Sequence, residues 1–231
     1  MFTETDVVRT TALGDFDHPQ VSCGIKSDDC YIVDVKRGVL PPVPYMHPTR
    51  VFHKGVDRKP ELAAMRICEL IAPHIAIPMT PDNREKSPGV YMRFIRGKQM
   101  MLRARYTPQH RYDLGCIAVL DALTGNSDRH TGNAMVTKSH VHPIDHGACF
   151  SYGVLNKRIS LFEPQASGSM KNQHVFDGVT ATLARVYEYA DDVAALLFKG
   201  SLRYTGEDVR EWTRNVRKEA EVDRVRKANQ W

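Results

Sequence analysis

The sequence predicts an α+β fold in which a β-rich first half is followed by a mostly helical second half. Short runs of β-branched and aromatic residues, separated by Gly, Pro and Asp, recur up to residue 53. From residue 60 the apolar residues recur mainly at helical spacing. Acidic and amide side chains gather in the middle of the chain, between apolar runs. We therefore expect two lobes, residues 1–93 and 94–231, with a cleft between them that holds the polar groups.

The strands expected from these runs are short and bounded by turn residues. They are Val7–Leu13, Val21–Ile25, Tyr31–Val35 and Arg50–His53 in the first half, and Val90–Ile95 later. Four prolines between residues 41 and 48 predict an irregular loop, because proline lacks the N–H that strands and helices use.

The first helix is predicted at Pro60–Ile71, since a proline stands at its start and Pro73 follows its end. The second half is expected to be helical around one small hairpin. Its elements are a helix at Leu114–Leu123, a hairpin of Ala134–Val136 and Val141–Ile144, one or two helices within Phe176–Phe198, and a last helix that opens at Thr205–Asp208 with a capping-box-like start.

Size and composition indicate a globular protein without a membrane span. The 231 residues suffice for one large domain or two small lobes. Hydrophobic residues make up 42% of the chain, yet the apolar runs are far too short to cross a bilayer. The first residues lack the basic start and apolar run of a signal peptide, so we expect a cytoplasmic enzyme. The five cysteines contain no Cys-x-x-Cys pair, which argues against a zinc ribbon or a disulfide framework.

The most informative stretch runs from Leu120 to Gly147. Asp128 is followed by Asn133 five residues later, and Asp145 stands twelve residues after that. A kinase-type phosphoryl-transfer site needs such a set, in which one carboxylate orients the attacking hydroxyl while an amide oxygen and a second carboxylate hold magnesium at the ATP phosphates. Each residue alone would be an ordinary loop residue, so the prediction depends on the three together.

Asp128–Asn133 reads Asp-Arg-His-Thr-Gly-Asn, and Ile144–Gly147 reads Ile-Asp-His-Gly. These motifs resemble the catalytic loop and the metal-binding turn of the HipA-like and phosphoinositide 3-/4-kinase-like branch of the protein-kinase-like superfamily. A moderate likeness covers Val51–Pro78, which looks like the family's lysine strand and following helix. The resemblance implies a bilobal protein-kinase-like fold, with a β-rich N-lobe containing one main helix and a mostly helical C-lobe. Small members of this branch occur in bacteria and phages, and the size of this chain suits that group.

Carried over by position, the resemblance gives Asp128 the role of orienting the acceptor hydroxyl or accepting its proton. His130 would support the catalytic loop or touch phosphate. Asn133 and Asp145 would hold Mg²⁺.

The nucleotide contacts follow from the same resemblance. Lys54 would neutralise the α/β-phosphates, and Glu61 would pair with it. Lys36 is the alternative phosphate lysine, because it ends a predicted strand. Met92 and Phe94 would belong to the hinge against which adenine docks.

Neighbouring polar residues have other interpretations. Asp121 is expected to be structural, and Arg129 to hold the loop or to lie near phosphate. Four histidines fall within seventeen residues, which would permit a transition-metal site. They are His130, His140, His142 and His146. The spacing does not support a His-x-x-x-His pair borne on a helix, and His140 and His142 fall in a predicted hairpin turn, so magnesium bound through oxygen ligands is preferred.

The sequence thus predicts an ATP- and Mg²⁺-dependent phosphotransferase whose preferred acceptor is a protein Ser/Thr hydroxyl or a small soluble molecule. A lipid acceptor stays open through the phosphoinositide-kinase likeness, although no membrane-binding helix is evident. No Gly-rich phosphate loop precedes Lys54, which favours the alternative of an inactive kinase-like binding module. Transfer of AMP in place of phosphate is a third alternative. The net charge of +5 needs no nucleic-acid partner, because ATP is itself a polyanion.

Overall fold

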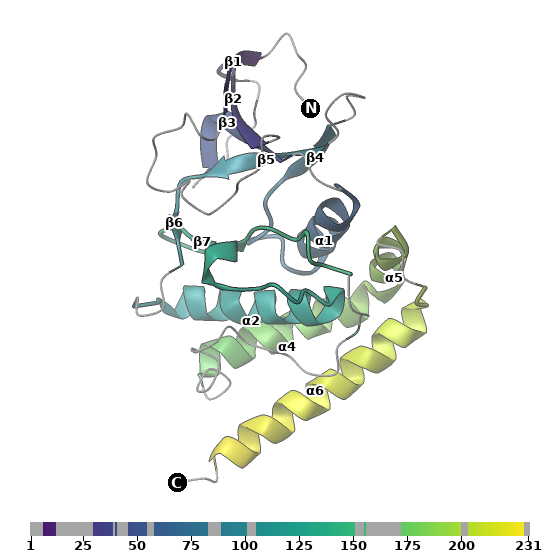
Figure 1. Ribbon diagram of the computed structural model, residues 1–231. Coiled ribbons are helices and arrows are strands. Elements are labelled where there is room, and N and C mark those ends of the chain that lie inside the picture. The colour runs from purple at the N-terminus through teal and green to yellow at the C-terminus, as the bar shows by residue number, and fades with distance from the viewer. Residues whose placement is uncertain are drawn as a thin grey trace.

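Antiparallel sheets and a group of helices make up the described part of the chain, which confirms the predicted α+β class (Figure 1). The computed structural model describes residues 7–12, 30–38, 40, 46–54, 58–82, 89–100, 105–150, 155, 172–199 and 203–228. The predicted strand Val21–Ile25 lies outside the described residues.

The larger sheet has five strands in the order β1-β2-β3-β5-β4, and every neighbouring pair is antiparallel. The strands are β1 (Val7–Ala12), β2 (Cys30–Val35), β3 (Met46–Lys54), β4 (Met79–Asp82) and β5 (Gly89–Ile95). Four of them were predicted. The fifth, β4, was missed because Pro81 disfavours a strand, yet an edge position tolerates a proline that cannot donate to a neighbour.

The end of the proline-rich segment differs from expectation. Pro48 was predicted to lie in an irregular loop, but β3 already includes it. The pairing of β3 with β5 shifts register between Met46 and Val51, so the proline lies at an irregular part of the ladder. Such a position does not need the missing N–H.

Helix α1 (Arg58–Ile71) lies between this sheet and the helices below it (Figure 1). Its buried face includes Met65, Ile67 and Cys68, all almost completely removed from solvent. Arg185 donates to the carbonyl oxygen of Leu70 through Nε at 3.2 Å and through a terminal nitrogen at 2.8 Å, which ties the last turn of α1 to helix α4 (Gln173–Glu188). The predicted helix is confirmed, with a start at residue 58 instead of 60.

Helix α2 (Pro108–Thr124) begins earlier than the predicted Leu114 because of its cap. The Thr107 hydroxyl accepts from the backbone N–H of His110 at 3.2 Å, and the Thr107 N–H donates to Nδ1 of His110 at 3.3 Å. This is a capping box with histidine in the place usually taken by Glu or Gln, so the usual sequence signature does not reveal it.

Helices α2 and α4 cross in close contact at two glycines. A Cβ on Gly115 would collide with the carbonyl oxygen of Val175, and a Cβ on Gly178 would collide with the carbonyl oxygen of Tyr112. Cys116 Sγ also lies 3.8 Å from the carbonyl oxygen of Gly178. The backbones therefore touch directly, which buries α2 on nearly every side from Asp113 onward.

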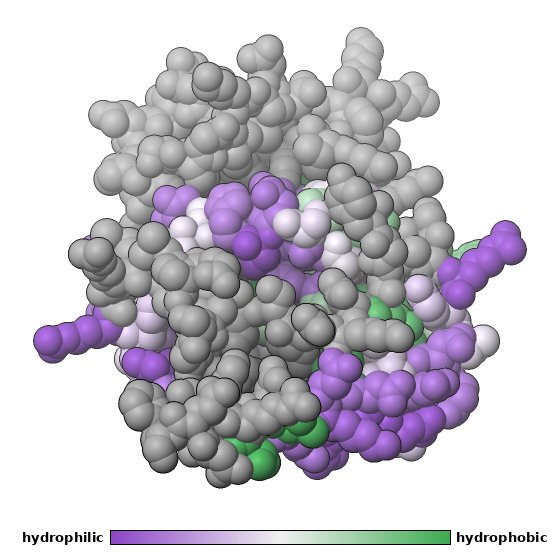
Figure 2. Space-filling view, turned by 60° about the horizontal axis from the view of Figure 1, so that its bottom comes forward, coloured by the Kyte–Doolittle hydropathy of each residue, from purple (hydrophilic) through white to green (hydrophobic). Residues whose placement is uncertain are grey.

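Two further helices are described, α5 (Ala190–Lys199) and α6 (Gly206–Ala228). The predicted Phe176–Phe198 segment therefore contains two helices, α4 and α5. The predicted capping box at α6 is confirmed, since Thr205 Oγ1 accepts from the Asp208 N–H at 3.2 Å while Asp208 Oδ2 accepts from the Thr205 N–H at 2.7 Å. The described part of the face in Figure 2 is mainly hydrophilic. Within the described residues, no helix is both long and apolar enough to cross a membrane.

In a smaller sheet, the segment that follows β5 pairs with the predicted hairpin. It consists of β6 (Lys98–Gln99), β7 (Ala134–Val136) and β8 (Val141–Pro143) in that order. The short 3₁₀ turn η3 (Thr131–Asn133) leads directly into β7. The boundary expected between residues 93 and 94 falls inside β5.

The glycine crossing generates a stability prediction. Gly178→Ala should lower the melting temperature, because overpacking against the Tyr112 carbonyl costs about 1–3 kcal/mol and outweighs the roughly 1 kcal/mol that alanine contributes to a helix. Ala184→Gly, at an exposed position of the same helix, measures the effect of helix propensity on stability alone. If Gly178→Ala raised the stability by as much as Ala184→Gly lowers it, the close approach of the α2 and α4 backbones would be contradicted.

Candidate functional site

Helix α2 ends where the candidate catalytic loop begins. Gly125 adopts a left-handed conformation, with φ 62° and ψ 36°, and its N–H donates to the carbonyl oxygen of Asp121. This glycine C-cap stops the helix without strain and turns the chain. Asn126 follows, and its side-chain oxygen accepts from the Asp128 N–H at 3.1 Å. The loop conformation is thus set by local hydrogen bonds before any ligand is considered.

The Arg129 guanidinium lies at the centre of the site. Its Nε lies 3.0 Å from Oδ2 of Asp121, and a terminal nitrogen lies 3.0 Å from Oδ1. The other terminal nitrogen donates to the carbonyl oxygens of Asn133 at 2.6 Å and of Ile144 at 2.5 Å. One buried side chain therefore joins the end of α2 to both segments that carry the candidate metal ligands.

The charge of Arg129 is compensated where it lies. Burial by itself lowers its pKa, but the Coulombic attraction and hydrogen bonds from Asp121 outweigh burial and raise the pKa above the ordinary arginine value. Only 6% of the Arg129 side chain and 9% of the Asp121 side chain are exposed, so water screens the pair little. The expected structural role of Asp121 and the loop-holding role of Arg129 agree with these contacts.

Asp128 and Asn133 are joined across the loop. The Asn133 side chain is 7% exposed, and its Nδ2 donates to the carbonyl oxygen of Asp128 at 2.9 Å. This bond directs the amide nitrogen toward the loop and leaves Oδ1 as the atom that can bind a cation. The Asp128 side chain is exposed, so its carboxylate is accessible to a substrate.

His130 is exposed and caps the turn that precedes Asn133. Its Nδ1 accepts from the Gly132 N–H at 2.9 Å. A Cβ at Gly132 would lie 2.6 Å from the His130 ring, so glycine is the residue that fits beneath the imidazole. The structure thus gives His130 a part in shaping the loop.

Asp145 has a left-handed backbone conformation, with φ 56°, which residues other than glycine rarely adopt. The two neighbouring peptides hold it there. The N–H of Ile144 donates to the Asn133 carbonyl oxygen at 3.0 Å, and the N–H of His146 donates to Oε2 of Glu61 at 2.9 Å. Strained residues of this kind concentrate at functional sites, where the surrounding structure determines them.

Glu61 reaches this turn from another element. It stands in the first turn of α1, and its side chain is 0% exposed. The expected pairing partner, Lys54, ends β3, and its side chain lies outside what the structure describes. The contact with the His146 backbone was not predicted, because nothing in the sequence relates residues that lie 85 positions apart.

The other predicted nucleotide contacts lie in the larger sheet or beside it. Lys36 directly follows β2 and is exposed. Met92 and Phe94 belong to β5, before its last residue Ile95, with Met92 buried and Phe94 partly buried. The chain then crosses toward the smaller sheet through Gly97, which is buried.

The turn after Asp145 packs on the end of α2. Nδ1 of His146 accepts from Arg129 at 3.3 Å, and the Cys149 N–H donates to the His146 carbonyl oxygen at 3.0 Å. Cys149 Sγ in turn donates to Thr124 Oγ1 at 3.4 Å. Burial raises the pKa of the Cys149 thiol to about 12, so this cysteine is no nucleophile at neutral pH. The sequence analysis assigned no role to Thr124 or Cys149, because nothing in the sequence shows that their side chains meet.

The four clustered histidines do not converge on one point. His130 faces Gly132, His146 faces Arg129, and His142 donates from Nδ1 to the Ile75 carbonyl oxygen at 2.9 Å. His140 instead joins a different group, with Asp113 and His74. The metal alternative is therefore wrong for the set that the sequence suggested.

Arg129→Lys should lower the free energy of unfolding by about 3 kcal/mol or more, because a lysine cannot reach Asp121 and two carbonyl oxygens together and leaves a buried carboxylate poorly paired. Denaturant unfolding measures the change. Arg214→Lys is the matched control, since Arg214 pairs with Glu207 on the exposed surface of α6 and should change stability little. Equal effects of the two substitutions would contradict the central role of Arg129.

His142 predicts a pH dependence of stability. Burial lowers the pKa of its imidazole from 6.5 to about 4. Below about pH 6.5 the unfolded chain binds a proton that the folded chain excludes, so the free energy of unfolding should fall between pH 6.5 and 4 by on the order of 3 kcal/mol. His142→Asn keeps a donor for Ile75 but does not titrate, so it should remove this part of the slope. Parallel stability curves for the two proteins over this range would show that His142 is not responsible.

Comparison with known proteins gives one family match. Residues 83–165 match the model of the family described as phosphatidylinositol 3- and 4-kinase. The matched segment contains Asp128, Asn133 and Asp145 but neither Lys54 nor Glu61. No curated protein matches the chain. The match covers little more than a third of the chain, and it supports a relationship to the phosphoinositide 3-/4-kinases and a kinase-type phosphotransferase function.

Proposed function

We propose that the protein is an ATP- and Mg²⁺-dependent phosphotransferase with a bilobal, HipA-like kinase architecture, which transfers the γ-phosphate of ATP to a hydroxyl group. The larger sheet with α1 is the N-lobe, and the helices below α1 with the smaller sheet are the C-lobe. The cleft between them is the nucleotide site.

One observation carries this proposal. The Arg129 guanidinium binds the backbone of Asn133 and of Ile144, the residue before Asp145. The amide and the carboxylate that were predicted as metal ligands therefore belong to segments held side by side. Asn133 is in addition bonded to the backbone of Asp128. A loop with a purely structural role would not require an oxygen ligand or a proton acceptor at any of these three positions.

The donor set suits magnesium. Asn133 offers an amide oxygen and Asp145 a carboxylate. Mg²⁺ prefers oxygen ligands, and proteins usually bind it through only a few side chains together with substrate phosphates. A magnesium ion held there supplies electrostatic stabilisation of charge on the phosphates. The backbone contacts on both sides of Asp145 fix the backbone of this residue before nucleotide binds, and preorganisation of this kind is what phosphoryl transfer chiefly requires.

Asp128 is the group that acts on the acceptor. Its exposed carboxylate orients the attacking hydroxyl and accepts its proton as the oxygen–phosphorus bond to the acceptor forms and the bond to ADP, the leaving group, breaks. Asn126 and Asn133 hold the Asp128 backbone from both sides. His130 shapes the adjoining turn and faces the transferred phosphate from the loop.

The N-lobe contributes the nucleotide contacts. Lys54, at the end of β3, would neutralise the α/β-phosphates, with Lys36 as the alternative, and Met92 and Phe94 on β5 would contact adenine. Glu61, the expected partner of Lys54, also accepts a hydrogen bond from the His146 N–H in the turn after Asp145. A movement of α1 would then displace the turn that carries Asp145.

The proposed acceptor is a protein Ser/Thr hydroxyl. A second candidate, the hydroxyl of an inositol lipid, is favoured by the match of residues 83–165 to phosphatidylinositol 3- and 4-kinases. Parallel assays with γ-labelled ATP on a Ser/Thr peptide library and on phosphatidylinositol vesicles separate the two. Label in peptide or in lipid identifies the acceptor class.

The test of the proposal combines binding with turnover. Mg-ATP should raise the melting temperature of the wild type more than ATP with EDTA does, and Asp145→Ala should abolish this difference. Asp128→Asn should keep the Mg-ATP stabilisation but lower phosphate transfer by about 10²-fold or more. Asp192→Asn, an exposed acid in the first turn of α5, is the control and should behave as wild type.

Three outcomes would contradict the proposal. No magnesium-dependent stabilisation of the wild type would leave the inactive binding module as the better description. Unchanged turnover in Asp128→Asn would remove that residue from the mechanism. Label recovered from α-labelled but not from γ-labelled ATP would show transfer of AMP.

A further inference from the structure

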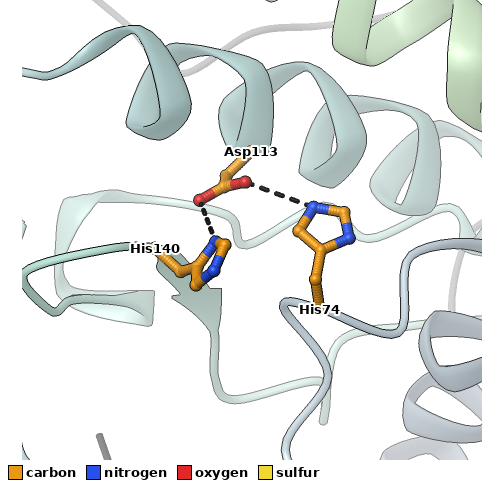
Figure 3. Close-up of side chains that lie close together, drawn as sticks. All are labelled: His74, Asp113 and His140. Atoms are coloured by element: carbon orange, nitrogen blue, oxygen red, sulfur yellow. Dashed lines mark hydrogen bonds and ion pairs between the residues drawn. The ribbon is translucent and has the colours of Figure 1, made fainter. Parts of the chain in front are cut away.

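Three polar side chains from separate parts of the fold converge outside the catalytic loop (Figure 3). His74 lies in the turn that follows α1, Asp113 lies in the first half of α2, and His140 lies in the turn between β7 and β8. Their ligand atoms all lie within 4.8 Å of one another. We propose that His74, Asp113 and His140 form a binding site for a divalent transition-metal ion of the zinc type, distinct from the magnesium site.

The carboxylate at the centre is fixed in orientation. Asp113 is 0% exposed. Its Oδ1 accepts from Gln109 Nε2 at 2.8 Å, and its Oδ2 accepts from the Val141 N–H at 2.9 Å. Each oxygen also lies 3.2 Å from a ring nitrogen of one of the two histidines. Such outer contacts orient a carboxylate ligand in metal sites.

The two imidazoles lie at distances that suit metal ligands. His74 Nε2 is 3.2 Å from Asp113 Oδ1, and His140 Nδ1 is 3.2 Å from Asp113 Oδ2. Ligand atoms at about 2.0–2.1 Å from a tetrahedral zinc ion are separated by about 3.3 Å. The two carboxylate–imidazole pairs thus have nearly this spacing, and all three ligand atoms lie within 4.8 Å of one another.

His74 Nε2 adds an independent observation. The atom is buried, yet its alignment with Asp113 Oδ1 is not that of a hydrogen bond, and among the described residues it has no hydrogen-bond partner. Buried ring nitrogens are normally satisfied, so such an atom calls for an explanation. A metal ion placed between the nitrogen and the carboxylate supplies that partner.

The ligand types decide the class of ion. Two imidazoles and one carboxylate favour zinc, cobalt, nickel or copper over magnesium and calcium, which prefer oxygen ligands alone. Three protein ligands leave a fourth tetrahedral position for water.

The position of the site suggests what the ion does for the protein. The backbone of His140 is held by Thr137, whose hydroxyl accepts from the His140 N–H at 3.0 Å, and this turn lies between Asn133 and Asp145 in the chain. An ion bound here joins the end of α1, the body of α2 and the β7–β8 hairpin. It therefore stabilises the scaffold of the candidate catalytic site without taking part in chemistry.

Metal titration of the full chain tests the site without reference to kinase activity. After treatment with EDTA and removal of the chelator, the wild type should bind one equivalent of Zn²⁺ in competition with a chromophoric chelator, and Zn²⁺ should raise its melting temperature. Co²⁺ should give visible absorption bands of a tetrahedral complex. Binding should weaken at lower pH, because metal must displace protons from the imidazoles.

Variants separate this site from the other histidines. His74→Ala and His140→Gln should each lower zinc affinity by at least about 10-fold, since even the loss of an outer contact to a metal ligand costs that much. His174→Ala, on the exposed first turn of α4, is the matched control and should bind zinc as the wild type does. Because His74 is partly exposed, its variant is expected to fold, and circular dichroism without metal verifies this.

Two results would overturn the proposal. One is the absence of saturable zinc binding by the wild type, which would mean that Asp113 only contacts the two histidines and binds no metal. The other is zinc binding that both variants retain at full affinity, which would place the metal elsewhere on the chain.

Discussion

The candidate site depends on a buried guanidinium. Arg129 carries a charge that would be costly to bury alone, and Asp121 on α2 compensates it. The same guanidinium still has donors for the carbonyl oxygens of Asn133 and Ile144, because arginine offers five N–H groups in a planar arrangement. The loop, the turn that carries Asp145 and the end of α2 are therefore joined through one side chain.

Helix α2, to which these segments are joined, is itself closely packed. Glycines at the crossing of α2 and α4 let two backbones touch, and the carboxylate of Glu61 reaches from α1 to the turn after Asp145. The strained φ of Asp145 persists because both neighbouring peptides are bonded elsewhere. A family match limited to residues 83–165 covers the loop and the turn, whereas the supports from α1 and α4 lie outside it.

Local signals predicted most of the regular structure. The capping box at Thr205–Asp208, the β7–β8 hairpin and α1 each follow from residues within one or two turns of chain, and each was found. The failures have a common cause. The start of α2 uses His110 in its cap, and the edge strand β4 contains Pro81, so the local pattern there departs from the usual one. Packing and strand pairing provided what the local residues lacked.

The sequence by itself determined which chemistry is available in the middle of the chain, because the spacing of Asp128, Asn133 and Asp145 can be read without a structure. It also determined where most helices and strands form, since these depend on near neighbours. Only the tertiary structure decided that Glu61 bonds to His146 and that His140 joins His74 and Asp113 instead of the other clustered histidines. The physical reason is that these contacts join residues far apart in the chain, and their distances are set by how α1, α2 and the hairpin pack together, which no local pattern records.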